Sequence, residues 1–323
     1  MLPMSGHPPP IMEKASAQQS RASVARNAGI VSLAVMASRV LGLARDQIFA
    51  ALFGAGLQYD AFLTAFRVPN LLRDLLAEGA LSSAFVTTFT QTLQQKGKDE
   101  AIRLSNRVAT LIVACITAVS IVAWVYTPEI VRLLAPGFYA VPGKAELTIE
   151  LTRVMMPFLL LIALAAQAMG MLNAFNIYGM PALASAFFNL GSIFGGLLLG
   201  YLIGPAIGLS PIAGMAYGTV IGGFLQFAVQ WPSLRRCGIG YRADWNVNDS
   251  GVRQILRLMG PAIIGAAAVQ INVFVNTSFA SAIVDPATGA VANGPVSWLN
   301  FAFRFMQFPI GVFGVAIATA TLP

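Results

Sequence analysis

Eight long apolar segments constrain the fold of this chain more than any other feature. Each is longer than the roughly 20 residues that a helix needs to cross a bilayer. Hydrophobic residues make up 57% of the chain and charged residues only 10%, a balance typical of a polytopic, all-α membrane protein and unlike a soluble domain. The expected spans are residues 27–55, 58–95, 104–127, 147–176, 181–203, 211–233, 250–284 and 295–321.

The first two of these segments contain charges that a helix facing lipid should not carry. A charge at the bilayer centre costs roughly 2.5–3.5 kcal/mol on insertion scales, so these side chains must face something polar. We interpret them as the lining of a water-filled cavity or a substrate path. The alternative is a set of buried ion pairs that only hold helices together. The residues are Arg39, Arg45, Asp46, Asp60, Arg67, Arg73, Asp74 and Glu78.

Helical periodicity groups these charges into stripes. At about 100° per residue, Arg39 and Asp46 share one face of the first helix, while Arg45 lies to one side. In the second helix Asp74 and Glu78 continue a stripe that begins at Arg67 and Asn70, and Arg73 is again rotated away. Pro69 predicts a kink in this helix. Asp60 follows a Gly-Ala-Gly turn and is expected either to act as a gate residue or to interact with its own helix dipole.

The basic residues outside the spans predict the orientation. Only Arg132 and Lys144 lie on one side of the eight-span arrangement. By the positive-inside rule the N-terminus is therefore expected to be cytoplasmic. Residues 1–26 are polar and are expected to form a disordered tail. The basic residues on the other side are Lys14, Arg21, Arg26, Lys96, Lys98, Arg103, Arg107, Arg235, Arg236, Arg242, Arg253 and Arg257.

The residues that most enzymes use are missing from the apolar core of the sequence. The single histidine, His7, lies in the tail, and the two cysteines, Cys115 and Cys237, are far apart and form no CxxC motif. No nucleophile elbow, P-loop or dinucleotide motif occurs. We therefore expect a transporter rather than an enzyme, without a metal or another cofactor and without a nucleic-acid partner.

A short internal repeat indicates the domain organisation. The tripeptide Ala-Phe-Arg at 65–67 in the second span recurs at 302–304 in the eighth, each time a few residues before a proline. Repeats six spans apart are parallel, related by an axis along the membrane normal. We expect residues 27–237 to form one six-helix lobe. Residues 238–323 are expected to be the first two helices of a second, truncated lobe.

The charged motifs resemble those of the MurJ/MviN family of lipid II flippases, within the superfamily of multidrug, oligosaccharidyl-lipid and polysaccharide exporters. The resemblance extends from about residue 27 to residue 323. It is carried by the sequences SRVLGLARD at 38–46, FGAGLQYDAF at 53–62, PNLLR at 69–73, AEGA at 77–80 and FPIGVFGVA at 308–316.

The resemblance implies a bacterial inner-membrane flippase of fourteen spans. It implies two six-helix lobes in a V around a cationic cavity, in which the lipid-linked peptidoglycan precursor lipid II is bound and moved by alternating access. The protein would be surrounded by membrane lipids, and an ion gradient or the membrane potential would drive transport. The implied substrate-binding residues are Arg39, Arg45, Arg73 and Arg304; the implied gate and pathway acids are Asp46, Asp60 and Glu78.

The chain departs from the family pattern at several positions. Asp74 stands where the family often has arginine, and Phe303 and Gln307 replace the usual acidic neighbours of Arg304. Asn272 or Asn276 stands where some members have a sodium-binding acid, which puts a cation site in doubt.

The chemistry of the candidate residues agrees with the implied substrate. A guanidinium group binds phosphate oxygens bidentately and stays charged at any pH, which suits a pyrophosphate in a partly dry cavity. The alternative function is a drug–cation antiporter of the same superfamily. Such a protein would need acids in its cavity, whereas the candidate positions here are mostly arginine.

Overall fold

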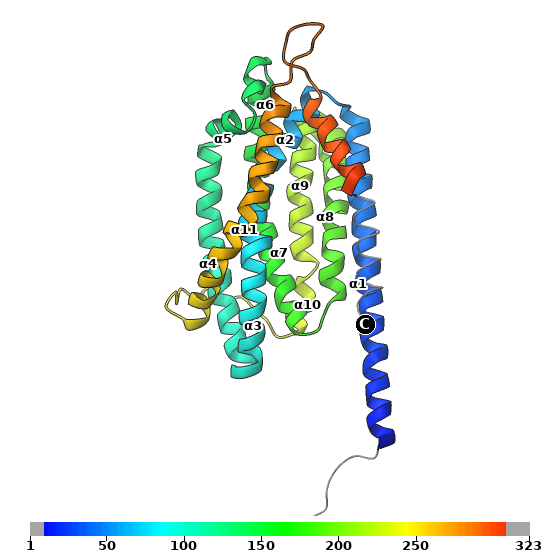
Figure 1. The fold of residues 1–323 in the computed structure, drawn as a ribbon, viewed down its shortest axis with the longest axis vertical. Helices are drawn as coiled ribbons and strands as arrows, with labels where there is room; N and C mark the ends of the chain where they lie inside the picture. Colours follow the sequence, from blue (N-terminus) through cyan, green and yellow to red (C-terminus); the bar gives the residue numbers. More distant parts are fainter. Residues whose placement is uncertain (1–9, 308–323) are drawn as a thin grey trace, which may run out of the picture.

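The structure, a computed structural model, describes residues 10–307; side chains are described except at 10–28, 30 and 77–80. The described part is a bundle of helices with long axes roughly parallel (Figure 1). After α11 a short loop leads into a last helical stretch, residues 295–307. The elements in order are α1 (Pro10–Phe53), α2 (Leu57–Leu72), η1 (Arg73–Leu81), α3 (Ser82–Lys96), α4 (Lys98–Val125), α5 (Thr127–Leu134), η2 (Pro136–Ala140), α6 (Lys144–Met155), α7 (Pro157–Ala174), α8 (Gly179–Leu197), η3 (Leu198–Ile203), η4 (Gly204–Ile207), α9 (Pro211–Ala228), α10 (Trp231–Arg236) and α11 (Ser250–Ser281).

Five stretches among the described residues are long and apolar enough to cross a membrane. They correspond to the third through seventh expected spans, which confirms the all-α polytopic fold. The first two expected segments are also helical but carry the charges discussed above, and the eighth is described only as far as residue 307. The five stretches are Lys98–Val125, Lys144–Ala174, Gly179–Ile207, Pro211–Arg236 and Ser250–Ser281.

The first helix begins earlier than expected. α1 starts at Pro10, so the expectation of a disordered tail through residue 26 is wrong for residues 10–26. Proline is favoured at the first position of a helix because its missing N–H would have no partner there. The Ala, Gln, Glu and Lys residues that follow are good helix formers, and this local preference outweighs the polar composition.

The second expected span is helical from Leu57 to Lys96 but is not one uniform α-helix. Its middle, η1, is a π-helix that starts four residues after Pro69. Proline cannot donate to the carbonyl one turn earlier, which loosens the regular hydrogen-bond ladder. The wider π-turn rotates the residues that follow it. The stripe predicted at 100° per residue therefore does not continue unchanged from Arg67 to Glu78.

The fourth expected span is divided into two helices. α6 ends at Met155 and α7 begins with Pro157 at its first position. Before α6, Gly143 adopts a left-handed conformation with φ of +77°, and the chain turns there into Lys144. This turn directs Lys144 into the protein interior, where its side chain is fully buried.

Close helix packing accounts for the glycines of α8 and α9, which lie side by side (Figure 1). A Cβ added to Gly218 would lie 2.4 Å from the backbone nitrogen of Gly196, and one on Gly191 would lie 2.8 Å from the Cα of Gly222. Only glycine permits this approach, as the small-residue spacing indicates. These two helices therefore form a tightly packed wall, against which α1 lies.

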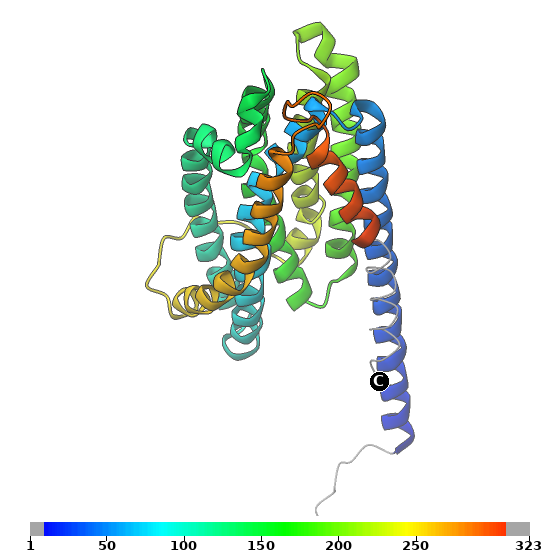
Figure 2. The ribbon, with the colours of Figure 1, turned by 45° about the horizontal axis from the view of Figure 1, so that its top comes forward.

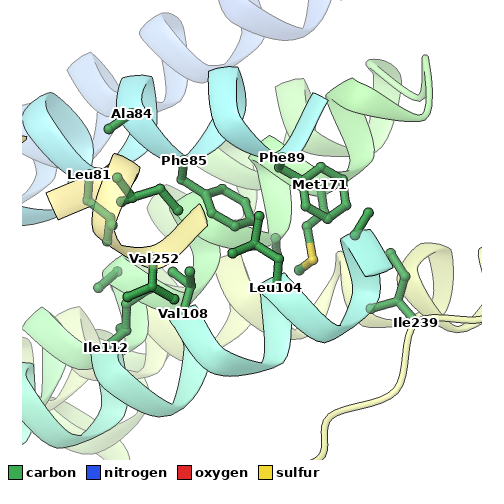
Figure 3. Packing of buried hydrophobic residues seen from close by; sticks show 14 of the residues in the cluster. Leu81, Ala84, Phe85, Phe89, Leu104, Val108, Ile112, Met171, Ile239 and Val252 are labelled. Atoms are coloured by element: carbon green, nitrogen blue, oxygen red, sulfur yellow. The ribbon is translucent and has the colours of Figure 1, made fainter. Parts of the chain in front are cut away.

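Two large apolar clusters fill the bundle. The first joins α3, α4 and α7 to the start of α11 through side chains that include Phe85, Phe89, Leu104 and Val252 (Figure 3). The second surrounds Phe49, Tyr59 and Phe62 and extends to Val296 in the last helical stretch. Residues 295–307 are therefore held against α1 and α2, beside the upper half of α1 in both ribbon views (Figure 2).

Candidate functional site

Two small cavities meet at Arg304, where residues 295–307 lie beside α1. The first has a volume of about 110 Å³ and is enclosed by α1, α2, α9 and residues 295–307. The second, also about 110 Å³, lies between α1 and the same stretch. Their charged lining residues are four arginines and one aspartate, a net charge of +3, which favours an anionic ligand. They are Arg39, Arg45, Asp46, Arg67 and Arg304.

Asp46 holds two of these arginines together. Its Oδ1 accepts from Nη2 of Arg45 at 2.9 Å, and its Oδ2 lies 2.6 Å from Nε of Arg304. The Arg45 guanidinium also lies over the Phe188 ring, 5.3 Å from its centroid. Because Arg304 belongs to the last helical stretch, this ion pair joins two parts of the chain that are far apart in sequence.

Arg39 faces the second cavity from an exposed position on α1, one turn before Gly42. The α-helix around it is fixed by α8: Nδ2 of Asn189 donates to the backbone oxygen of Ser38 at 3.0 Å. Gly42 leaves room for that amide, because a Cβ there would lie 3.5 Å from Nδ2 of Asn189. Three of the four predicted substrate-binding arginines, including Arg39, therefore lie around one site.

Arg67 is a fourth cation at this site. It belongs to the predicted polar stripe of the second span but not to the residues predicted to bind substrate. It lines the first cavity and donates from Nη1 to the backbone oxygen of Val273 at 3.4 Å and to Oγ1 of Thr277 on α11. No carboxylate lies within 4.0 Å of it among the described residues. The charge of Arg67 is therefore not neutralised by a carboxylate, and its side chain joins α2 to α11.

Arg73 lies outside both cavities. It donates from Nη2 to Oδ1 of Asp74 at 2.8 Å, and Asp74 accepts in turn from Gln270 of α11 at 3.2 Å. Arg73 opens the π-helix, where the backbone departs from the regular spacing that places Arg67 toward the cavity. Glu78 also lies in η1, but its side chain is outside the described residues.

Asp60 forms a second, fully buried polar centre. Its Oδ2 lies 2.9 Å from Nζ of Lys144, and neither side chain has any solvent exposure. The backbone N–H of Gly294 donates to Oδ2 at 2.7 Å, while the backbone N–H and the hydroxyl of Ser297 donate to Oδ1 at 2.8 and 2.6 Å. Lys144 also donates to Oδ1 of Asn293 at 3.0 Å. Asp60 therefore interacts with the N-terminus of the helical stretch 295–307, not only with that of its own helix.

Asn70 belongs to the predicted stripe of the second span, whereas Asn300 and Lys144 are not among the predicted site residues. Asn300 and Asn70 line the first cavity, and the side-chain oxygen of each is buried without a hydrogen-bond partner in the described structure. Asn300 is an uncharged polar residue one turn before Arg304, and its residue type alone gives no signal for a site. Lys144 was placed in a loop by its charge, and only the Gly143 turn shows that it is buried. Among the described residues, no three His, Cys, Asp or Glu side chains gather to hold a metal.

Comparison with known proteins places this chain in a family. The sequence model described as "Lipid II flippase MurJ" matches residues 49–323. The lipid II flippase MurJ of Burkholderia cenocepacia is 34% identical over 297 residues, covering 91% of this chain and 55% of that protein. The probable lipid II flippase MurJ of Rhizobium meliloti is 35% identical over 307 residues, covering 93% of this chain and 54% of that protein.

Solved structures agree on the fold. A lipid II flippase MurJ in an inward closed conformation is similar with a TM-score of 0.72 and 28% identity, over 90% of this chain and 57% of that one. An inward-facing multidrug transporter of the MATE family has a TM-score of 0.60 at 17% identity, which shows a shared fold only. The chain spans about half the length of the curated relatives it matches. It belongs to the lipid II flippase MurJ family.

Proposed function

We propose that the chain belongs to a flippase that moves lipid II across the bacterial cytoplasmic membrane by alternating access. The observation that carries the proposal is the ion pair of Asp46 with Arg45 and Arg304. Here two guanidinium groups from distant parts of the chain share one carboxylate, and the two adjoining cavities together have a net charge of +3. A pyrophosphate offers the same oxygen geometry with more charge, and can replace the carboxylate as their partner.

The arginines Arg39, Arg45 and Arg304 would bind the pyrophosphate, with Asp46 holding two of them in position while the site is empty. Arg67 would add an unneutralised charge beside them. Arg73 would contact the substrate at another point of its path, since it lies outside the two cavities and pairs with Asp74. A drug–cation antiporter is disfavoured, because one carboxylate among four arginines would repel a cationic drug.

Asp60 would act as a gate at the opposite end from the basic loops. Its hydrogen bonds to Gly294 and Ser297 tie α2 to the last helical stretch, and Lys144 on α6 supplies the opposing charge. These bonds would close the extracellular side of the cavity and break when it opens outward. In this account residues 27–237 form the first lobe, and residues 238–323 begin the second.

A translocation assay tests the proposed substrate. The intact transporter is reconstituted in vesicles with lipid II on one leaflet, and the fraction reaching the other leaflet is measured by an enzyme that modifies only exposed lipid II. We expect lipid II to cross in vesicles carrying an imposed ion gradient or membrane potential, and a fluorescent cationic drug not to be exported. Drug export without lipid II movement would contradict the proposal.

The proposed orientation has a direct test. In a variant with Cys115 and Cys237 replaced by serine, a cysteine at Gly240 is expected to react with an impermeant maleimide only after the cell is opened. A cysteine at Ala140, which is exposed near the other end of the bundle, is expected to react in intact cells. Gly240 is a suitable site because a Cβ there has open space around it. Labelling of the Gly240 variant from outside would refute a cytoplasmic N-terminus.

A further inference from the structure

A third cavity, separate from the charged site, lies between α4, α7, α9 and α10. Its volume is about 220 Å³ and its walls are mostly apolar. It lies toward the end of the bundle where α10 and the base of α3 are found (Figure 1). The main apolar lining residues are Val113, Leu164, Met171, Phe227, Leu234 and Ile239. A cavity of this lining suits a hydrocarbon chain.

Two buried amides interrupt this apolar surface. The Asn106 side chain is only 8% exposed and has no hydrogen-bond partner in the part of the chain that the structure describes. Gln167, 3% exposed, donates from Nε2 to the backbone oxygen of Ser105 at 2.8 Å, and its side-chain oxygen also lines the space without a described partner. The polar atoms of these amides that lack a protein partner are accessible from the cavity, so they can hydrogen-bond a polar atom of a ligand.

The rim of the cavity is aromatic and positively charged. Trp231 and Tyr241 line it, and the Arg235 guanidinium lies over the Trp231 ring at 5.1 Å from its centroid. Arg236 and Arg242 are exposed next to these aromatic residues in the chain. None of the three arginines has a carboxylate partner among the described residues. Tryptophan and tyrosine favour the level of the lipid headgroups, where arginine can meet a phosphate.

The nearby acids contact Arg107, and none of them lies within 4.0 Å of Arg235, Arg236 or Arg242 among the described residues. Arg107 on α4 contacts Glu100 at 3.1 Å, Asp244 at 3.0 Å and Asp249 at 2.9 Å. The same interactions fix the chain around Tyr241, since the backbone N–H of Asp244 donates to Oγ1 of Thr110 at 3.1 Å. The mouth of the cavity is thus structured, with its positive charge directed outward.

We propose that this cavity binds an anionic phospholipid of the surrounding leaflet. One acyl chain occupies the apolar space, the Asn106 amide donates to an ester carbonyl, and the phosphate lies among Arg235, Arg236 and Arg242. Neutral phospholipids have the same chains and esters but no net negative charge, so the three arginines set the preference for acidic headgroups. The site does not share residues with the charged cavities and does not depend on the transport proposed above.

Quenching of Trp231 tests the proposal at the site itself. The other tryptophans, Trp124, Trp245 and Trp298, are replaced by phenylalanine, and the purified chain is reconstituted in phosphatidylcholine vesicles. A small fraction of the lipid is then brominated phosphatidylglycerol or brominated phosphatidylcholine. We expect the acidic lipid to reach half-maximal quenching at a mole fraction at least about five-fold lower than the neutral lipid does. The attraction of a single arginine to an acidic headgroup is already large enough to produce this difference.

Matched variants separate the parts of the site. Combined Arg235→Gln, Arg236→Gln and Arg242→Gln substitutions should remove the preference for phosphatidylglycerol and leave quenching by the neutral lipid unchanged. Ala109→Phe, which fills the cavity without a change in charge, should reduce quenching by both lipids. Arg253→Gln removes an exposed charge at the start of α11 and should change nothing. Equal quenching by both lipids in the parent chain, or an unchanged preference in the triple variant, would overturn the proposal.

Discussion

Replacing Lys144 with methionine is expected to destabilise the described conformation by about 3–5 kcal/mol, because the substitution leaves the buried carboxylate of Asp60 without its cation. Both side chains are fully buried, so water cannot compensate for the loss. The three hydrogen bonds from Gly294 and Ser297 remain, and they hold a charge that has lost its counter-ion. Thermal unfolding of the purified protein in detergent measures the effect.

The double variant Asp60→Asn with Lys144→Met separates loss of a charge from loss of the pair. Removing both charges should restore a large part of the stability, since no unpaired buried charge remains. Asp60→Asn alone should raise the accessibility of the cavity from outside, because it weakens the contacts to the helical stretch 295–307. A cysteine at Asn300, which lines the cavity, reports this change. Stability that is equally low in the single and double variants would show that the ion pair is not the cause.

Replacing Arg304 with alanine is expected to abolish lipid II translocation while the protein still inserts into the membrane at its normal level. Hydrogen bonds of charged groups contribute roughly 1.5–3 kcal/mol each, so losing two to a phosphate weakens binding by more than a hundred-fold. Arg304→Lys retains the charge and loses the two-pronged geometry, and should be partly active. Arg45→Ala should resemble Arg304→Ala, since both arginines contact Asp46.

The competing structural explanation gives a different pattern. If these arginines only hold helices together, alanine should lower the amount of protein in the membrane, and lysine should restore the amount and the activity together. Translocation and membrane level are therefore measured for both substitutions at each position. Arg132→Gln is the control: Arg132 is exposed and stacks on Tyr139, away from the cavity. Normal translocation by Arg304→Ala at a normal level would exclude a role in binding.

The helical architecture could be predicted because a membrane leaves few alternatives for a long apolar segment. That Arg45 faces a polar space follows from charges that must avoid lipid, whereas the assignment of Arg304 to the same site comes from the family resemblance. The structure of the N-terminal tail is harder to predict from the sequence. Its polar composition predicts disorder, whereas residues 10–26 contain strong helix formers after Pro10 and extend α1. Composition alone does not distinguish these outcomes.

The positions of Arg73 and Lys144 depend on features of the backbone that helical periodicity in the sequence does not describe. The resemblance implies that Arg73 binds substrate; in the structure Arg73 opens a π-helix, pairs with Asp74 and lines neither of the two cavities. Lys144 was assigned to a loop, but the left-handed turn at Gly143 directs it toward Asp60. Neither the wider turn nor the partner across 84 residues can be derived from local periodicity.

The hydrogen-bond donors around Asp60 differ in whether a side-chain substitution can remove them. Two of the three groups that bond it from the far end of the chain are backbone N–H groups, of Gly294 and Ser297, which remain after most side-chain changes. A substitution at Ser297 can therefore preserve the backbone contact, whereas Gly294, with φ of +114°, is needed for the main-chain geometry of its own donor. A change at Asp60 to a residue without a side-chain acceptor removes all of these bonds at once. Mutational tolerance is thus unequal on the two sides: the acceptor on α2 is irreplaceable, while its partners need only keep their main-chain geometry.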